Sequence, residues 1–167
     1  MSDMSFLNRK SPRAQWHDYS GGLYFITICT TGKLHYFGEI TDGVMQLNSI
    51  GHFCRQELQA INSHYPYASV PLFVVMPNHI HAIINIDVDD SKELCDSCYR
   101  TVHRKTLSVV VGGFKSAVSL FAHKNAIEFS WQKRYHDHII RGLKDGNLIA
   151  DYITNNVARW DSDCFRI

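Results

Sequence analysis

The sequence has no long apolar run, no strong excess of charge of either sign and few prolines. No apolar stretch in the 167 residues approaches the roughly 20 residues that a membrane-spanning helix needs. Residues 1–11 lack the apolar core of a signal peptide. The net charge of +1 gives no sign of a polyanionic partner. These absences argue against a membrane protein and predict a cytoplasmic one.

Cysteine is scarce and does not form a recognisable framework. The five cysteines stand at positions 29, 54, 95, 98 and 164. An odd number in a chain expected in the cytoplasm argues against a set of disulfides. Cys95 and Cys98 have the spacing of a zinc knuckle and His103 follows, but no second pair completes a zinc site. We therefore expect residues 87–105 to form a polar loop, and the role of Cys95 and Cys98 stays open.

The composition is that of an ordinary globular domain, with 45% hydrophobic and 20% charged residues. Runs of β-branched and aromatic residues predict strands at 23–30, 70–75 and 80–86, and a hairpin around an Asp-Gly turn at 37–47. The runs at 70–75 and 80–86 read either as adjacent strands or as one strand interrupted by proline. Helical spacing of apolar residues predicts helices at about 48–63, 107–125 and 147–157, and residues 128–141 are expected to be a strand or an extended connector.

This order of elements predicts an α+β fold. We expect a single-domain, ferredoxin/RRM-like sandwich, with a mainly antiparallel sheet, helices on one face and a separate C-terminal helix. Residues 1–20 are polar and precede Gly21-Gly22, and they carry the basic residues Arg9, Lys10 and Arg13. We expect an N-terminal basic arm over residues 1–20 and one domain over residues 21–167.

Two histidines lie two residues apart in the apolar run 74–86. Side chains alternate along a strand, so His79 and His81 should share one face while Ile80 points into a core. Two imidazoles that converge from one strand can begin a metal site. The chain has 10 histidines, so pairs of this kind also arise by chance, and a packed, hydrogen-bonded pair is the commoner outcome.

The last expected helix carries a second pair of polar residues. Tyr152 and Asn156 are four residues apart and would lie on one helical face. A tyrosine hydroxyl can act as a covalent nucleophile, and an asparagine oxygen can bind a divalent cation. Docked over His79 and His81, this face would give two nitrogen ligands and one oxygen ligand with a phenol beside them. A tyrosine on an amphipathic helix is more often a core residue.

Together these motifs resemble the single-tyrosine HUH transposases, most closely the REP-associated tyrosine transposases and their insertion-sequence relatives. His79-Ile80-His81 matches the His-hydrophobic-His motif, and Met76-Pro77-Asn78 matches its common Pro-Asn lead-in. Tyr152-Ile153-Thr154-Asn155-Asn156 matches the Tyr-Ile-x-x-Asn pattern of the last helix. The resemblance covers about residues 8–165 and departs from the family at Val157, where members often have proline.

The resemblance implies a mechanism and a site. Family proteins cut single-stranded DNA, usually near a hairpin, and leave a 5′-phosphotyrosine and a free 3′-OH. Carried over to this chain, Tyr152 would be the nucleophile on a catalytic C-terminal helix. His79, His81 and Asn156 would bind Mg²⁺ or Mn²⁺. Since imidazole must be neutral to bind a metal, the ordinary histidine pKa predicts that activity falls below about pH 6.

The expected partner is single-stranded DNA with a hairpin, which would associate the protein with the nucleoid, and a homodimer is expected as well. Single strands bind through basic grooves and aromatic stacking. The candidate DNA contacts are Arg9, Lys10, Arg13, Lys115, Lys133, Arg134 and Arg141, with Trp16, Tyr19 and Trp131 for stacking. Charge clusters taken alone are more often solvated faces.

Three alternatives stay open at this point. The first is a domesticated protein that binds and processes genomic hairpins without mobility. The second is an unrelated metal-dependent phosphoesterase that uses water, although no carboxylates accompany the histidine pair in sequence. The third is an RRM-like nucleic-acid binder in which the histidines are structural. No general base is evident.

Overall fold

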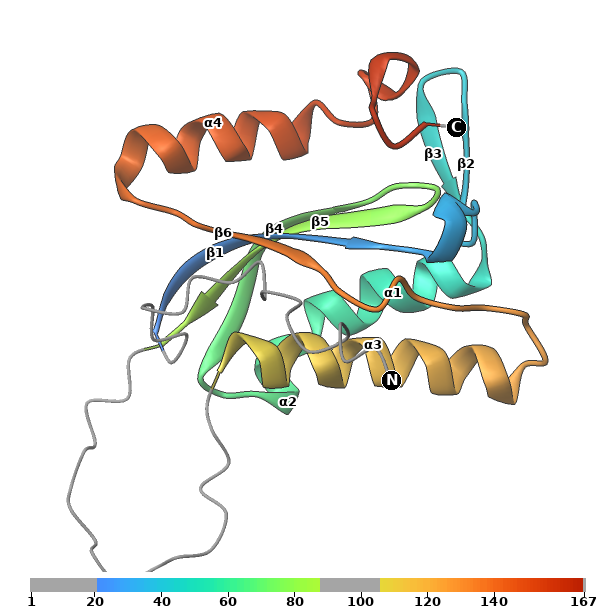
Figure 1. The fold of residues 1–167 in the computed structure, drawn as a ribbon, viewed down its shortest axis with the longest axis horizontal. Helices are drawn as coiled ribbons and strands as arrows, with labels where there is room; N and C mark the ends of the chain where they lie inside the picture. The colour runs from blue at the N-terminus through green and yellow to red at the C-terminus, as the bar shows by residue number, and fades with distance from the viewer. Residues whose placement is uncertain (1–20, 88–105, 167) are drawn as a thin grey trace, which may run out of the picture.

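The computed structural model describes residues 21–87 and 106–166 and has an α+β fold (Figure 1). Its antiparallel sheet has the strand order β4-β5-β1-β6. These strands are β1 (Gly22–Cys29), β4 (Ala68–Val75), β5 (His79–Ile86) and β6 (His136–Ile139). A separate hairpin consists of β2 (Gly38–Thr41) and β3 (Val44–Leu47). The expected fold class and the mainly antiparallel sheet are confirmed.

Helices cover the sheet on both sides (Figure 1). On one side lie α1 (Ser49–Gln59), α2 (Ile61–His64) and α3 (Leu107–Lys124). On the other side lies α4 (Gly142–Thr154). None of the helices in the described part of the chain combines the length and the apolar character of a membrane span. The proposed arm at 1–20 and the Cys95/Cys98 loop lie outside the described residues, so the expected domain division stays a prediction.

Side chains of the central strands β1 and β5 point alternately to the two faces of the sheet. Ile26 and Ile28 of β1, with Ile80 of β5, are fully buried in the core that α1 and α3 cover. The register of the two strands pairs Thr27 with His81. Because directly opposed residues share a face, Thr27 and His81 point away from that core, toward α4. The expected direction of Ile80 is therefore the one observed.

The two apolar runs before and after Met76-Pro77-Asn78 form adjacent strands and not one interrupted strand. The turn between β4 and β5 is closed by a hydrogen bond from the Met76 amide to the His79 carbonyl, 2.9 Å long. Pro71 lies within β4, where it is tolerated because β4 is at the edge of the sheet and its register shifts between Ser69 and Leu72. This hairpin places His79 at the start of β5.

The last helix differs from the sequence-based expectation. It begins at Gly142, where the Asp145 carboxylate accepts hydrogen bonds from the Arg141 amide (2.9 Å) and the His138 ring (3.0 Å). It ends at Thr154. Tyr152 is therefore helical, but Asn156 lies in the following turn, so the prediction of one helical face for both was wrong. The expected helix at 48–63 is divided at Ala60 into α1 and α2.

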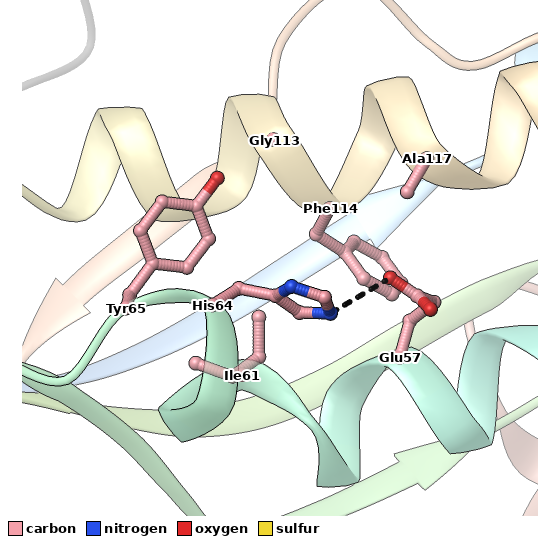
Figure 2. Close-up of a pocket in the computed structure, with 7 residues that line it drawn as sticks. All are labelled: Glu57, Ile61, His64, Tyr65, Gly113, Phe114 and Ala117. Atoms are coloured by element: carbon pink, nitrogen blue, oxygen red, sulfur yellow. Dashed lines mark ion pairs between the residues drawn. The ribbon is translucent and has the colours of Figure 1, made fainter.

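A cavity lies on the far side of the sheet from α4, between the α1–α2 pair and α3 (Figure 2). In it the His64 ring lies 3.8 Å from the Glu57 carboxylate. The Tyr65 hydroxyl points at Gly113, where an added Cβ would lie only 1.8 Å from it. Gly113 thus allows a close approach to α3. The cavity belongs to helix packing and is separated by the sheet from His79 and His81.

Candidate active site

The structure brings together the four residues that the motifs single out. The Tyr152 hydroxyl lies 3.2 Å from His81 Nε2, and the rings of His79 and His81 are 4.5 Å apart between centroids. The Asn156 side chain lies close enough to His79 and Tyr152 to affect the pKa of both. His79, His81 and Asn156 are each at most 1% exposed. The site is a compact buried group between the sheet and α4.

Neighbouring apolar side chains fix this arrangement. The Phe25 ring, on the same face of the sheet, stacks on His81 at 5.3 Å and meets Tyr152 edge-on at 6.1 Å. Aromatic pairs prefer these two geometries. Ile153, the residue after Tyr152, is buried and anchors α4. Tyr152 is therefore held beside the histidine pair by the Phe25 ring and by the burial of the neighbouring Ile153.

Two buried atoms in the group have lone pairs to offer and no hydrogen-bond partner: His79 Nε2 and Asn156 Oδ1. Leaving a buried polar atom without a hydrogen bond costs about 1–3 kcal/mol, so two such atoms in one site indicate a place where a ligand could bind. Imidazole nitrogen and amide oxygen are both ligands for divalent cations. The side chains present therefore fit a divalent cation, held by two nitrogens and one neutral oxygen.

This donor set is unusual in having no carboxylate. Across residues 21–87 and 106–166, no group of three or more His, Cys, Asp or Glu side chains is arranged for a metal ion.

Burial keeps both histidines neutral. It lowers the pKa of His79 to about 3, opposed by the Asn156 side chain and aided by Lys33. It lowers the pKa of His81 to about 3 as well, aided by His79 and opposed by Asp163. Neutral imidazole is the form that binds a metal. While the site stays covered, protonation is thus shifted well below the pH of about 6 expected from the ordinary histidine pKa.

Acid is expected to destabilise this covered site. The unfolded chain takes up protons near the ordinary pKa of 6.5, whereas folded His79 and His81 stay neutral down to about pH 3. The unfolded state then binds more protons, so the free energy of unfolding falls as the pH decreases through this window. The slope is at most about 1.4 kcal/mol per pH unit for each group. Denaturant titrations at several pH values measure it.

The matched variants for this measurement are two histidine-to-glutamine changes. His79→Gln should reduce the slope, while His52→Gln, at an exposed position of α1, should leave it unchanged. Equal slopes in the native protein and the His79 variant would contradict the expectation.

Residues 160–166, here called the covering segment, pack over the part of the site that α4 does not cover. The Phe165 ring lies 4.5 Å from the His79 ring and 5.9 Å from the His81 ring, between centroids. The buried Trp160 ring stacks on His79 at 6.2 Å. The burial of the two histidines therefore depends on this segment, which sequence reasoning missed. Its only sequence signal is a pair of aromatic residues in a polar stretch.

The covering segment is tied to the body of the domain by main-chain contacts. The Lys33 ammonium donates to the Cys164 carbonyl at 2.9 Å and lies 5.3 Å from the centre of the Phe165 ring. The Asn78 side-chain NH₂ group donates to the Phe165 carbonyl at 2.8 Å. Burial, aided by Asp163 of the segment, raises the pKa of Tyr152. The closed arrangement thus keeps the phenol protonated and denies access to His79.

The structure gives the candidate DNA contacts Lys115 and Trp131 a role within the fold. The Lys115 ammonium donates to the Gln132 carbonyl at 2.8 Å, and the Trp131 indole donates to the Lys115 carbonyl at 3.0 Å. The Trp131 ring also packs against Phe37 and Phe129. These contacts fix both residues within the fold, and their contact with DNA stays a prediction.

The remaining candidate contacts stay predictions. Lys133, Arg134 and Arg141 are exposed on the connections around β6. Arg9, Lys10, Arg13, Trp16 and Tyr19 lie outside the described residues.

Comparisons with known proteins agree with the motifs. The chain is 36% identical over 166 residues to a Haemophilus influenzae protein of unassigned function, covering 93% of this chain and 92% of that one. It is 26% identical over 137 residues to a second Haemophilus influenzae protein, assigned to the REP-associated tyrosine transposases, covering 81% of this chain and 70% of that one. No family model matches the sequence.

A solved structure shares the fold. It is a REP-associated tyrosine transposase bound to a REP hairpin, with a TM-score of 0.62 and 18% identity, covering 90% of this chain and 74% of that one. At this level of sequence identity, the likeness shows that the two chains share a fold and no more than that. The chain is therefore similar in sequence to one REP-associated tyrosine transposase and in fold to another, and its His79-Ile80-His81 and Tyr152 motifs resemble those of this family.

Proposed function

We propose that this chain cleaves and rejoins single-stranded DNA beside a hairpin, with Tyr152 as the nucleophile and with His79, His81 and Asn156 as ligands of Mg²⁺ or Mn²⁺. The observation that carries the proposal is the position of the Tyr152 hydroxyl, 3.2 Å from His81 Nε2 and beside two buried atoms that lack a partner. Metal-assisted phosphoryl transfer requires a nucleophile next to atoms that are free to bind a metal ion.

In the proposed reaction, Tyr152 attacks the DNA and one strand is broken. The Tyr152 oxygen attacks the phosphorus of the scissile phosphodiester and loses its proton as the new P–O bond forms. The bond to the 3′ oxygen breaks, and that oxygen takes up a proton to become a free 3′-OH. The product is a 5′-phosphotyrosine, whose energy is close to that of the bond it replaces. A second 3′-OH can therefore reverse the step and join two strands.

The ligand residues supply the other half of the site. Bound there, a divalent cation would polarise the phosphate and offset the charge that develops on its oxygens. His79, His81 and Asn156 contribute no charge of their own, since both imidazoles are neutral. A neutral donor set leaves the full charge of a cation available to the phosphate.

The substrate class rests on the family and on the fold neighbour, which was solved with a REP hairpin. We extend this to a hairpin with a single-stranded flank, because the reaction needs an unpaired strand that can reach Tyr152. The expected homodimer stays a prediction.

The test is the formation of a covalent protein–DNA adduct. The protein is incubated with a 5′-labelled and a 3′-labelled hairpin oligonucleotide and Mn²⁺, then denatured and separated on a gel. Only the fragment that lies 3′ of the break should stay attached to protein, and chelation of the metal should prevent it. The attached peptide, identified by mass spectrometry, should contain Tyr152. Hairpin binding with no adduct under any metal condition would instead indicate a nucleic-acid binder without catalysis.

The covering segment should limit this reaction, because a phosphate reaches His79 only when Phe165 moves. Complete burial of a phenylalanine contributes about 1.5–3 kcal/mol, and Phe165 is partly buried. Phe165→Ala should therefore shift the balance by about 1.4 kcal/mol, a roughly tenfold larger open population. We expect the initial rate of adduct formation to rise roughly tenfold, measured with DNA in excess.

The control for this variant is Arg166→Ala. Arg166 forms an ion pair with Asp161, with half of its side chain exposed. Exposed pairs contribute little to stability, so its loss should leave the rate nearly unchanged. A Phe165 variant that reacts no faster than the native protein would show that the segment does not limit access.

A further inference from the structure

Asn78 is the polar residue most deeply involved in the site that no motif argument assigns a function. It is fully buried and directly precedes His79 at the start of β5. Its amide nitrogen lies 3.0 Å from the Lys33 carbonyl and 2.8 Å from the Phe165 carbonyl. Its amide oxygen lies 2.8 Å from His79 Nδ1.

These contacts determine which way the amide faces. Carbonyl oxygens accept hydrogen bonds and cannot donate them, so the two carbonyls must face the NH₂ group of Asn78. The Asn78 oxygen is then the atom that faces His79. An amide oxygen also only accepts, so His79 Nδ1 must carry the hydrogen.

The position of that hydrogen decides the other end of the ring. A neutral imidazole has a single N–H, so His79 Nε2 is left with a lone pair. His79 Nε2 is also the buried ring atom that has no hydrogen-bond partner. A histidine side chain in water favours the opposite tautomer, with the hydrogen on Nε2, so the protein has to impose the one required here.

We infer that Asn78 is a positioning residue, which holds His79 in the Nδ1–H tautomer and so presents the Nε2 lone pair to the site. Outer partners of this kind fix the tautomer and orientation of metal-binding histidines. The tautomer follows from the hydrogen bonds alone, and only its use for a cation rests on the proposed function.

His81 shows by contrast why Asn78 is decisive. His81 Nδ1 lies 2.9 Å from the Thr27 hydroxyl, and a hydroxyl can donate or accept. Thr27 therefore tolerates either tautomer of His81. Asn78 allows one tautomer of His79, because its direction is set by two acceptors.

The restraint should outlast opening of the site. Of the two carbonyls that orient Asn78, that of Phe165 belongs to the covering segment. That of Lys33 belongs to the short 3₁₀ turn Thr31–Lys33, which follows β1. When the covering segment moves, the Lys33 carbonyl still faces the Asn78 NH₂ group, and the oxygen still faces His79.

The test reads the tautomer directly in the metal-free protein. Long-range ¹H–¹⁵N NMR spectra of histidine-labelled protein distinguish a protonated Nδ1 from a protonated Nε2. Native His79 should have a protonated Nδ1 and an unprotonated Nε2. Asn78→Ala removes the acceptor and should move His79 toward the Nε2–H form.

Metal binding supplies the second readout. Asn78→Ala should weaken Mn²⁺ binding about 10- to 100-fold in calorimetry, in line with the loss of other outer partners. Asn85→Ala is the matched control, since Asn85 lies on β5 and donates to Asp87 at 2.9 Å. It should change neither the tautomer of His79 nor the affinity.

The outcomes separate this inference from the proposed function. A native His79 with its hydrogen on Nε2 overturns the inference, and this needs no variant and therefore no assumption about folding. An Asn78→Ala protein that keeps the native tautomer overturns it as well. If the tautomer behaves as expected but the native protein binds no Mn²⁺, Asn78 still fixes the tautomer and the metal-dependent part of the proposed function fails.

Discussion

Tyr152→Phe is expected to abolish the covalent protein–DNA adduct while the protein stays folded and binds the hairpin. The change removes one oxygen atom and keeps the ring that packs edge-on against Phe25. It also removes the hydrogen bond to His81 Nε2, which typically contributes about 0.5–1.5 kcal/mol. A loss of that size leaves a domain folded, whereas the loss of the nucleophile leaves no route to the adduct.

The measurement is the yield of denaturation-resistant adduct, with hairpin affinity determined in parallel. Tyr67→Phe is the matched control, because Tyr67 is partly buried against the core and packs on Tyr65, away from the histidines. It should react at the native rate. Adduct formed by the Tyr152 variant, mapped to another residue, would show that Tyr152 is not the nucleophile.

His79→Ala is expected to lose metal binding and cleavage together. The variant removes one of the two nitrogen ligands that we propose and one of the two buried atoms of the site that have no partner. We expect Mn²⁺ affinity to fall at least about 100-fold, at or beyond the upper end of the effect of losing an outer partner. Adduct formation should fall below detection, while hairpin binding should persist.

Thermal stability gives an independent readout of the same change. A ligand that binds only the folded state stabilises it by about 2.7 kcal/mol at a concentration of 100 times its Kd. Mn²⁺ should therefore raise the melting temperature of the native protein and leave that of His79→Ala unchanged. His52→Ala, at an exposed position of α1, should respond as the native protein does. Cleavage by the His79 variant at the native rate would remove the argument for a metal.

Much of the fold could be predicted because it depends on patterns of residues that are close together in the sequence. The alternation of β1 and β5 follows from a side-chain period of two, and it placed Ile80 in the core and His79 with His81 on the other face. The Asp-Gly turn between β2 and β3 has positive φ at Asp42 and Gly43, the conformation that these residues favour in hairpins. The Asn48 side chain caps α1 through the Gly51 amide, close to the start of the helix expected from about residue 48.

The helix ends could not be predicted because they depend on side chains from other elements. The start of α4 depends on Asp145, which also accepts from His138 of β6. No periodic pattern records that contact. At the other end of α4, Asn156 lies in the turn that follows the helix, although the sequence predicts it within the helix. The hydrogen bond from the Trp131 indole to the Lys115 carbonyl joins α3 to a distant connector and could not be predicted either, and the DNA contacts of both residues stay predictions.

The sequence by itself determined the fold class, the shared face of His79 and His81, and the tyrosine motif that pairs with them. These depend on strand periodicity and on residues close together in the chain. Only the tertiary structure decided that Phe165 covers His79, that burial lowers the pKa of both histidines, and that Asn78 faces Nδ1 with its oxygen. Each of these depends on groups that meet only when segments distant in sequence pack together, because burial and hydrogen-bond direction are properties of the packed chain.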